Sequence, residues 1–258
     1  MNLEAIWHDL ECGGYTEDLA LWRGLAPDAG GPVLDIGAGT GRVTLELAAW
    51  GVSVVALDVA APLLAALASR ASGMSVETVV ADARDFSLSR RFELIAVPMQ
   101  TLQLFGGRAG RAAFLRCALE HLEPGGLLAA AIADAIDCFD DEHDLPPPPD
   151  ACEILGVRYA SQLLGVVDER GGAAIHRRRE TVGGQDHRVT QDVVVHLDRV
   201  SADEVAAEAL ELGFACQPHL YVPESDQYLG STVVVLKARR RRGDLRACRR
   251  RPAADRRR

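Results

Sequence analysis

Residues 33–41 read Val-Leu-Asp-Ile-Gly-Ala-Gly-Thr-Gly, and this stretch decides the fold. Its first four residues suit a buried strand, three glycines follow at alternate positions, and an amphipathic helical pattern begins directly afterwards at residues 42–50. Glycine takes a positive φ at little cost and leaves space where a side chain would collide with a ligand. The first N–H groups of the following helix point into the same turn. Strand, glycine turn (residues 37–41) and helix together predict a binding site for a nucleotide-like ligand.

The spacing of the glycines distinguishes this turn from two common phosphate-binding loops. A dinucleotide fingerprint reads Gly-x-Gly-x-x-Gly, and a triphosphate loop ends in Gly-Lys-Ser or Gly-Lys-Thr. Here Gly41 comes two residues after Gly39, Arg42 follows it, and an acid, Asp35, precedes the first glycine, Gly37, by two positions. The pattern matches neither loop, and a tight turn without a ligand is the alternative interpretation.

The string Asp-x-Gly-x-Gly-x-Gly at residues 35–41 closely resembles motif I of the class I S-adenosylmethionine (SAM) dependent methyltransferases. In that family the acid lies beside the positively charged methionine part of SAM, and the glycines pass under the ribose. The resemblance implies an α/β fold: a doubly wound, mostly parallel, seven-stranded sheet with strand order 3-2-1-4-5-7-6. It also implies that SAM is the cofactor.

Two later acids follow the same pattern. Residues 53–57 read as a buried parallel strand that ends in Asp58, 21 positions after Gly37. At this interval an acid meets the ribose hydroxyls, and a carboxylate can accept two hydrogen bonds from a cis diol. Residues 81–83 read Ala-Asp-Ala and are similar to the family segment in which the aspartate, here Asp82, accepts from the adenine amino group. Simple capping roles are the alternatives for both acids.

The corner after the predicted fourth strand, residues 92–97, faces the methyl group in this family. Residues 97–100 read Val-Pro-Met-Gln, which matches neither the Asn/Asp-Pro-Pro-aromatic string of base N-methylating enzymes nor the Pro-Cys of cytosine C5 enzymes. The metal-dependent catechol type has acids after strands four and five. Asp134 fits the second position, but Pro98 and Met99 supply no ligand for the first. The sequence therefore argues against base methylation and against a metal.

These resemblances assign the cofactor-binding residues, whereas the catalytic residues stay open. A hydroxyl or protonated amine acceptor needs a base, and the sequence offers several histidines without deciding among them. The residues assigned to SAM are Asp35, Gly37, Ala38, Gly39, Thr40, Gly41, Asp58, Val59, Asp82, Ala83, Val97 and Pro98. The candidates for catalysis are His143, Tyr15 and Gln100, with His176, His187 and His196 as further possible bases.

Tyr15 lies just before a predicted helix that Thr16 can cap and that carries Leu19, Trp22 and Leu25 on one face. In many small-molecule methyltransferases an N-terminal helix and an aromatic residue close over the cofactor. Tyr15 is therefore a candidate lid residue. A surface tyrosine packed on its own helix is the alternative.

The strand and helix alternation stops after residue 134, which suggests an insertion. An acidic loop and four prolines at residues 146–149 precede three alternating segments at 159–168, 173–182 and 188–197, typical of antiparallel strands. A capped helix from Ser201 and two strands, residues 214–222 and 231–237, then complete the pattern. We expect a SAM-binding domain at 1–134 and 200–237, a substrate-covering insertion at 135–199, and a disordered Arg-rich tail at 238–258.

Charge is distributed unevenly along the 258 residues. Of the 28 basic and 37 acidic residues, 11 and 2 fall within residues 238–258, which leaves a net charge of −18 on residues 1–237. Such an acidic body repels polyanions, so nucleic acid is an improbable partner. The Arg-rich tail could in principle bind nucleic acid, but without aromatic residues a solvated extension is the better interpretation.

Composition and cysteine usage favour a soluble cytoplasmic protein. Six cysteines are scattered without a Cys-x-x-Cys pair, which fits a reducing compartment better than disulfides or zinc. No signal-like start and no apolar run of about 18 residues is evident, so a membrane partner is not expected.

The sequence thus predicts a SAM-dependent methyltransferase that methylates an O or N nucleophile, less often a C nucleophile, of a small molecule. The alternatives are a nucleic-acid or protein methyltransferase that docks through the Arg-rich tail, and a SAM-binding protein without catalysis. A nicotinamide enzyme is a more distant alternative because its glycine fingerprint is missing.

Overall fold

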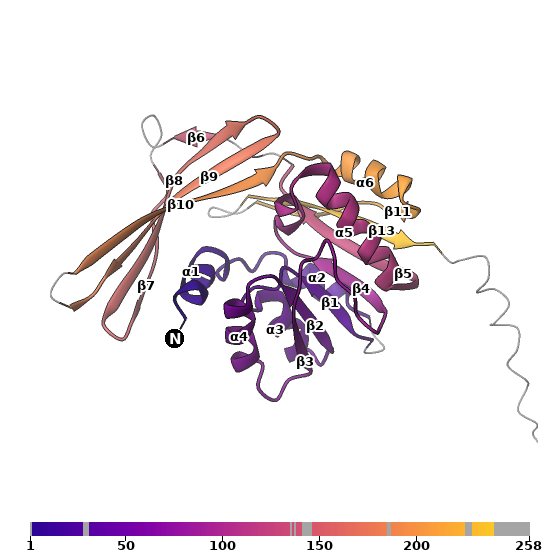
Figure 1. Ribbon diagram of the computed structural model, residues 1–258, viewed down its shortest axis with the longest axis horizontal. Helices are drawn as coiled ribbons and strands as arrows, with labels where there is room; N and C mark the ends of the chain where they lie inside the picture. The colour runs from indigo at the N-terminus through magenta and orange to yellow at the C-terminus, as the bar shows by residue number, and fades with distance from the viewer. Residues whose placement is uncertain are drawn as a thin grey trace, which may run out of the picture.

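The computed structural model describes residues 2–27, 31–134, 136, 138–140, 146–184, 187–224 and 229–239. Two β-sheets organise these residues (Figure 1). From edge to edge, the large sheet contains β11 (Phe214–Cys216), β13 (Ser231–Ala238), β5 (Leu122–Ile132), β4 (Phe92–Val97), β1 (Val33–Ile36), β2 (Val54–Asp58) and β3 (Val76–Val80). A further strand, β12 (Leu220–Val222), pairs with β13.

This strand order confirms the predicted fold class. The strands β3, β2, β1, β4 and β5 are parallel neighbours in the predicted order, and β13 and β11 take the places of the predicted seventh and sixth strands. β13 runs antiparallel to both β5 and β11. The helices are α1 (Leu3–Cys12), α2 (Leu19–Leu25), α3 (Arg42–Ala49), α4 (Ala61–Arg70), the 3₁₀ helix η1 (Thr101–Leu104), α5 (Gly107–His121) and α6 (Ala202–Glu211).

Helices cover both faces of the large sheet. In β1, Leu34 and Ile36 pack in a buried cluster with residues of α5 and α6, whereas Val33 packs in a cluster with residues of α2 and α3. Leu64 and Leu67 of α4 extend this second layer over β2. Strands that are covered on both faces need apolar residues almost throughout, as residues 33–36 and 54–57 have. Because β1, β2 and β4 are parallel, their carboxyl ends lie side by side at one end of the sheet.

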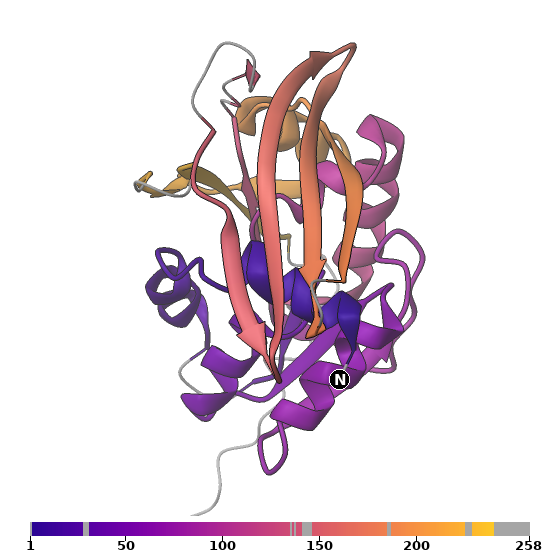
Figure 2. The same cartoon turned by 90° about the vertical axis from the view of Figure 1, so that its left-hand side faces the viewer.

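A small sheet lies beside these carboxyl ends (Figures 1 and 2). Its strands are antiparallel: β6 (Phe139–Asp140), β7 (Asp150–Ile154), β8 (Val157–Glu169), β9 (Gly172–Val182) and β10 (Arg188–Asp198). The three long strands confirm the alternating segments read from the sequence. β7 was not predicted because its five residues, directly after the prolines, give too short a pattern. The figures show α1 between the small sheet and α4, and α1 contacts both.

Three local predictions were wrong. The segment 214–222 forms two strands instead of one. Residues 123–126 read Glu-Pro-Gly-Gly, which predicts a turn and a strand that starts only at Leu127. Instead β5 begins at Leu122, because a register shift against β4 and a positive φ at Gly125 accommodate these residues within the strand. The residue before α2 is Asp18 instead of Thr16, and its carboxylate binds other side chains.

Some predictions concern residues that the structure does not describe. His143 and most of the acidic loop lie outside the described residues, as do residues 240–258 of the Arg-rich tail. The last strand, β13, ends at Ala238, one residue after the predicted boundary. In the part of the chain that the structure describes, no helix is long and apolar enough to span a bilayer.

Candidate cofactor site

The glycine turn has the predicted conformation. Gly37, Gly39 and Gly41 have φ values of 69°, 54° and 97°, in the left-handed region that only glycine takes at little cost. The turn leaves β1 and leads into α3 without an intervening loop. The N–H groups of Gly37 and Ala38 both donate to the carbonyl of Leu57, so the turn is attached to the end of β2.

Asp35 lies under this turn and is almost completely buried, with 1% of its surface exposed. One carboxylate oxygen, Oδ2, accepts a hydrogen bond of 2.6 Å from Thr44 Oγ1. The other, Oδ1, is buried and has no hydrogen-bond partner among the described residues. Burial raises the pKa of Asp35 to about 7, although the Thr44 hydrogen bond opposes the shift. A buried carboxylate with an open oxygen suits a cationic ligand, because an unmet acceptor costs about 1–3 kcal/mol.

Asp58 ends β2 beside the glycine turn, as the spacing predicted. Its Oδ2 accepts from the N–H of Gly39 and its Oδ1 from the N–H of Ala60, both at 2.8 Å. Each carboxylate oxygen has a second lone pair that can accept from a hydroxyl. Val59, the next residue, is 68% exposed, so the carboxyl end of β2 is followed by an exposed apolar side chain.

Asp82, after β3, binds Arg84. The carboxylate accepts from the Arg84 backbone N–H at 2.8 Å and from its guanidinium at 2.6–3.1 Å. These hydrogen bonds hold the pKa of Asp82 below its usual range. Ala83 is buried, and Arg84 also reaches the carbonyl of Phe105. Sequence reasoning missed Arg84, although an arginine two residues after an acid was a signal for this pair.

The corner after β4 is held by a residue that the sequence did not single out. Val97 and Pro98 are buried, and Gln100 is half-buried just before η1. Gln103, 1% exposed, donates to the carbonyls of Ala133 and Asp198 and accepts from the N–H of Ala133. It therefore links η1 to the end of β5 and to the end of the small sheet.

Side chains of α1 and η1 lie close to the glycine turn. A Cβ atom on Gly39 would clash with Nε2 of His8, and one on Gly37 would lie 2.5 Å from Cγ2 of Thr101. His8 belongs to α1, and its Nδ1 lies 3.1 Å from Thr40 Oγ1. Burial lowers the pKa of His8, which favours the neutral imidazole.

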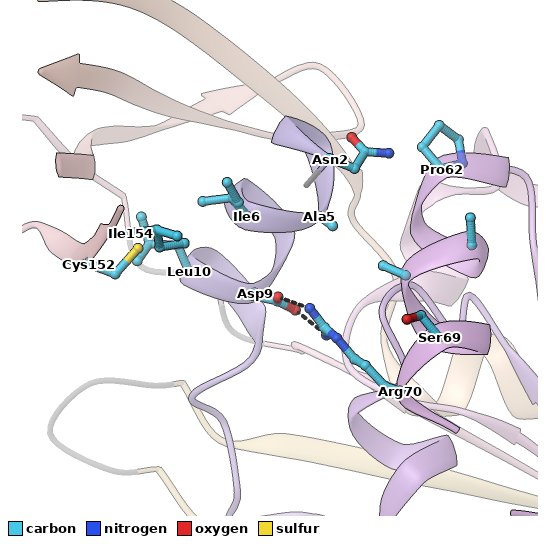
Figure 3. Close-up of a pocket in the computed structure, with 12 residues that line it drawn as sticks. Asn2, Ala5, Ile6, Asp9, Leu10, Pro62, Ser69, Arg70, Cys152 and Ile154 are labelled. Carbon is cyan, nitrogen blue, oxygen red and sulfur yellow. Dashed lines mark hydrogen bonds and ion pairs between the residues drawn. The ribbon is translucent and has the colours of Figure 1, made fainter. Parts of the chain in front are cut away.

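A cavity of about 590 Å³ lies between α1, α4 and β7 (Figure 3). Ile6 and Leu10 of α1 and Ile154 of β7 give it apolar walls. The Asp9–Arg70 ion pair crosses it from α1 to α4, and Arg70 also reaches the carbonyl of Thr40.

Tyr15 is a buried residue, with 3% of its surface exposed, so the surface alternative was wrong. It packs in the apolar cluster that includes Trp22 and residues of β13. The guanidinium of Arg42 lies 4.9 Å from the ring centroid, and it pairs with Asp18. The element whose side chain reaches the glycine turn is α1, through His8.

The other described candidate bases lie on or beside the small sheet, where His176 of β9 and His196 of β10 occupy paired strands. His196 is exposed and lies 2.9 Å from Glu169, His187 is exposed, and His176 is half-buried on β9. The histidine that lies at the turn is His8, which sequence reasoning missed together with α1. The Asn2 side chain that caps α1, with Glu4 in the first turn, was an available signal for the helix.

Comparison with known proteins supports the same assignment. Residues 33–126 match the sequence model of a family described as a methyltransferase domain. The cypemycin N-terminal methyltransferase of a Streptomyces species is 35% identical over 114 residues, which cover 44% of this chain and 44% of that protein. The match thus spans less than half the length of this curated relative.

Solved structures extend the likeness over most of the chain, at identities that establish the fold alone. One is the SAM-bound amino pentose methyltransferase of calicheamicin biosynthesis from Micromonospora echinaspora: 19% identity, 92% of this chain and 98% of that chain covered, TM-score 0.66. Another is a sugar N-methyltransferase from a Streptoalloteichus species: 18% identity, 92% and 87% covered, TM-score 0.67. Residues 33–126 thus match a methyltransferase domain, and the strand order of the large sheet is the one that the resemblance of residues 35–41 to motif I implies.

Proposed function

We propose that this protein is a SAM-dependent methyltransferase that methylates an O or N nucleophile of a small molecule. The observation that carries the proposal is Asp35, a buried carboxylate with one oxygen for which the described part of the chain supplies no hydrogen-bond partner. Such an oxygen is stable only if a donor or a cation meets it. The charged methionine part of SAM supplies both.

The proposed roles of the other residues follow from their chemistry. The glycine turn lets the cofactor approach the backbone, Asp58 accepts from the ribose hydroxyls, and Val59 covers an apolar face of the adenine. Asp82 accepts from the adenine amino group and shares its carboxylate with Arg84. When bound, SAM supplies an activated methyl group. The chain contributes alignment of the acceptor, which can lower a barrier by roughly 7–11 kcal/mol.

The proposed acceptor is a small molecule, with an amine favoured. Two proteins of similar fold are an amino pentose methyltransferase and a sugar N-methyltransferase, and the second methylates a nitrogen atom of a sugar. The acidic body disfavours nucleic acid. The name of the cypemycin relative favours a second candidate, the N-terminal amine of a peptide.

We also propose that different parts of the chain bind the cofactor and cover the acceptor. Residues 1–134 and 200–237 form the SAM-binding domain, and residues 135–199 form a cover for the acceptor. Support comes from the separate hydrogen bonding of the two sheets. The Arg-rich tail, 238–258, has no part in this proposal.

The test of the proposed function is a binding measurement followed by an acceptor screen. Isothermal titration with SAM and with S-adenosylhomocysteine (SAH) should give saturable binding, and titration with NADH should give none. Amino sugars, peptides with free N-termini, phenols and short RNAs are then compared by mass spectrometry for SAH formation. Turnover on RNA alone would contradict the small-molecule proposal. Tight SAM binding without SAH formation from any acceptor would favour a non-catalytic protein.

Asp58→Ala should raise the dissociation constant for SAM by about tenfold or more, because hydrogen bonds to a charged group contribute about 1.5–3 kcal/mol. The same change removes the anchor of the Gly39 N–H. Titration calorimetry measures the effect. Asp85→Ala, which removes a nearby exposed acid, is the control and should bind normally. Unchanged affinity of Asp58→Ala would rule out the ribose role.

A further inference from the structure

We propose that the cavity between α1, α4 and β7 is a second ligand site, which binds a large apolar α-amino acid (Figure 3). The ammonium group of the ligand binds Asp9, its carboxylate binds Arg70, and its side chain lies against the apolar walls. Of the residues assigned to SAM, none is among the described residues that line this cavity. The inference therefore goes beyond the proposed function and does not depend on it.

The walls of the cavity suit a large apolar side chain. Ile6 and Leu10 of α1 and Ile154 of β7 form one side, whereas α4 presents Ala65, Ala66 and other short side chains that leave the space open. The volume of about 590 Å³ lies within the range of small-molecule sites, roughly 300–1,000 Å³. Transfer of an apolar side chain from water into such walls is favourable in proportion to the area that it buries.

The charged groups of the cavity are an acid and a base in direct contact. Both terminal nitrogens of Arg70 donate to the carboxylate of Asp9, and the pair joins α4 to α1 (Figure 3). The side chains of Asp9 and Arg70 remain 37% and 40% exposed. Burial alone raises the pKa of Asp9, but hydrogen bonds from Arg70 and Thr40 outweigh it and lower that pKa. Asp9 is therefore charged, and both members of the pair are accessible to a ligand.

This pair suits a zwitterion better than an ion of one sign. A carboxylate has about four lone-pair sites and a guanidinium has several N–H donors, so each partner can bind a further group without losing the other. An anion at this position is attracted by Arg70 but repelled by Asp9, and a cation meets the reverse. An α-amino acid carries its ammonium and carboxylate groups on one carbon atom, so both charges can reach the pair together.

The first experiment titrates the wild-type protein with L-phenylalanine and three analogues by isothermal titration calorimetry. L-Phenylalanine should bind saturably with a dissociation constant of about 1 mM or lower. The analogues are 2-phenylethylamine, which lacks the carboxylate, 3-phenylpropionate, which lacks the ammonium group, and L-alanine, which lacks the ring. Each should bind at least about tenfold more weakly, because each loses a charged partner or the apolar contact. No saturable binding of L-phenylalanine, or equal binding of either singly charged analogue, would overturn the proposal.

Two pairs of variants then locate the bound amino acid. Arg70→Gln should weaken phenylalanine binding at least about tenfold, since the carboxylate loses its cation. The matched control is Arg90→Gln, which removes the arginine of another exposed ion pair, with Glu77, away from the cavity. Ala66→Phe keeps the Asp9–Arg70 pair but places a ring in the cavity, and it should abolish binding.

Ala68→Phe is the control for the cavity-filling variant, because Ala68 is an exposed residue of the same helix that does not line the cavity. Both control variants should bind phenylalanine as the wild type does. Circular dichroism verifies that each variant folds. Normal phenylalanine binding by a folded Arg70→Gln or Ala66→Phe variant would show that the amino acid binds elsewhere.

A competition experiment separates this site from the cofactor site, since SAM and SAH are themselves amino acids. In saturating SAH the dissociation constant for phenylalanine should stay within about fivefold of its value without SAH, because the two ligands occupy different sites. An apparent dissociation constant that rises in proportion to the SAH concentration would place phenylalanine in the cofactor site and overturn the proposal. Phenylalanine binding by a protein that binds neither SAM nor SAH would support the second site and contradict the proposed function.

Discussion

Replacing Gly39 by alanine should raise the dissociation constant for SAM at least 100-fold. The backbone at Gly39 has φ of 54°, where an L-residue costs roughly 1–2 kcal/mol. More importantly, the new Cβ occupies the space over the glycine turn that His8 fills in this structure. A cofactor bound there would meet the same methyl group. Isothermal titration calorimetry measures the loss of affinity.

Gly51→Ala provides the matched control for this prediction. Gly51 also has a positive φ, 83°, but a Cβ there meets no atom of the described residues within 4 Å. Both variants share the backbone strain, and Gly39→Ala must also displace His8, so its free energy of unfolding in urea should fall at least as far as that of Gly51→Ala. Only Gly39→Ala should lose SAM binding. Affinity within threefold of the wild type for Gly39→Ala would show that no ligand lies against the turn.

Asp35→Asn should have the second large effect, and it should also change the pH dependence of binding. Burial raises the pKa of Asp35 to about 7, so roughly a tenth of the protein carries this charge at pH 6 and most of it at pH 8. A cationic ligand prefers the charged carboxylate. SAM affinity of the wild type should therefore rise about tenfold from pH 6 to pH 8, whereas the variant should bind weakly and without this rise.

The same group affects the stability of the unbound protein, with the opposite sign. An unfolded Asp35 releases its proton near pH 4, while the folded protein keeps it until about pH 7. The folded state thus binds more protons over this interval, and the free energy of unfolding should fall as pH rises from 4 to 7. Asparagine keeps an acceptor for Thr44 Oγ1 but does not titrate, so the fall of the free energy of unfolding between pH 4 and pH 7 should be absent in this variant. Urea unfolding at pH 5 and pH 7 measures the difference, and equal slopes for wild type and variant would contradict a buried protonated Asp35.

Local sequence patterns predicted the fold because each strand, turn and helix of the large sheet is specified by residues that are close together in the sequence. Residues 33–41 contain their own strand, turn and helix start, and Asp58 follows at the spacing that the parallel crossover fixes. The alternation at 159–168 and 173–182 likewise predicted two long strands without any long-range information. These elements are specified by residues within one or two turns of the chain.

The content of the site was less predictable because it depends on contacts between distant segments. His8 lies against Thr40, 32 residues away, and Glu11 binds Arg179 across 168 residues. No periodicity links such positions, and an isolated histidine or acid on a short helix has no special spacing. Gln103 was overlooked for the same reason, since its partners Ala133 and Asp198 come from other elements. The sequence predicts where the glycine turn lies, and only the packed structure reveals what covers it.

A crystal structure of the protein with SAH tests the central claim most directly, which is that the glycine turn and the acids beside it bind this cofactor. The account predicts SAH at the carboxyl ends of β1 and β2, with its ribose on Asp58 and its amino group facing Asp35. A structure grown in saturating SAH that shows the ligand bound elsewhere, or no bound ligand at all, would contradict it.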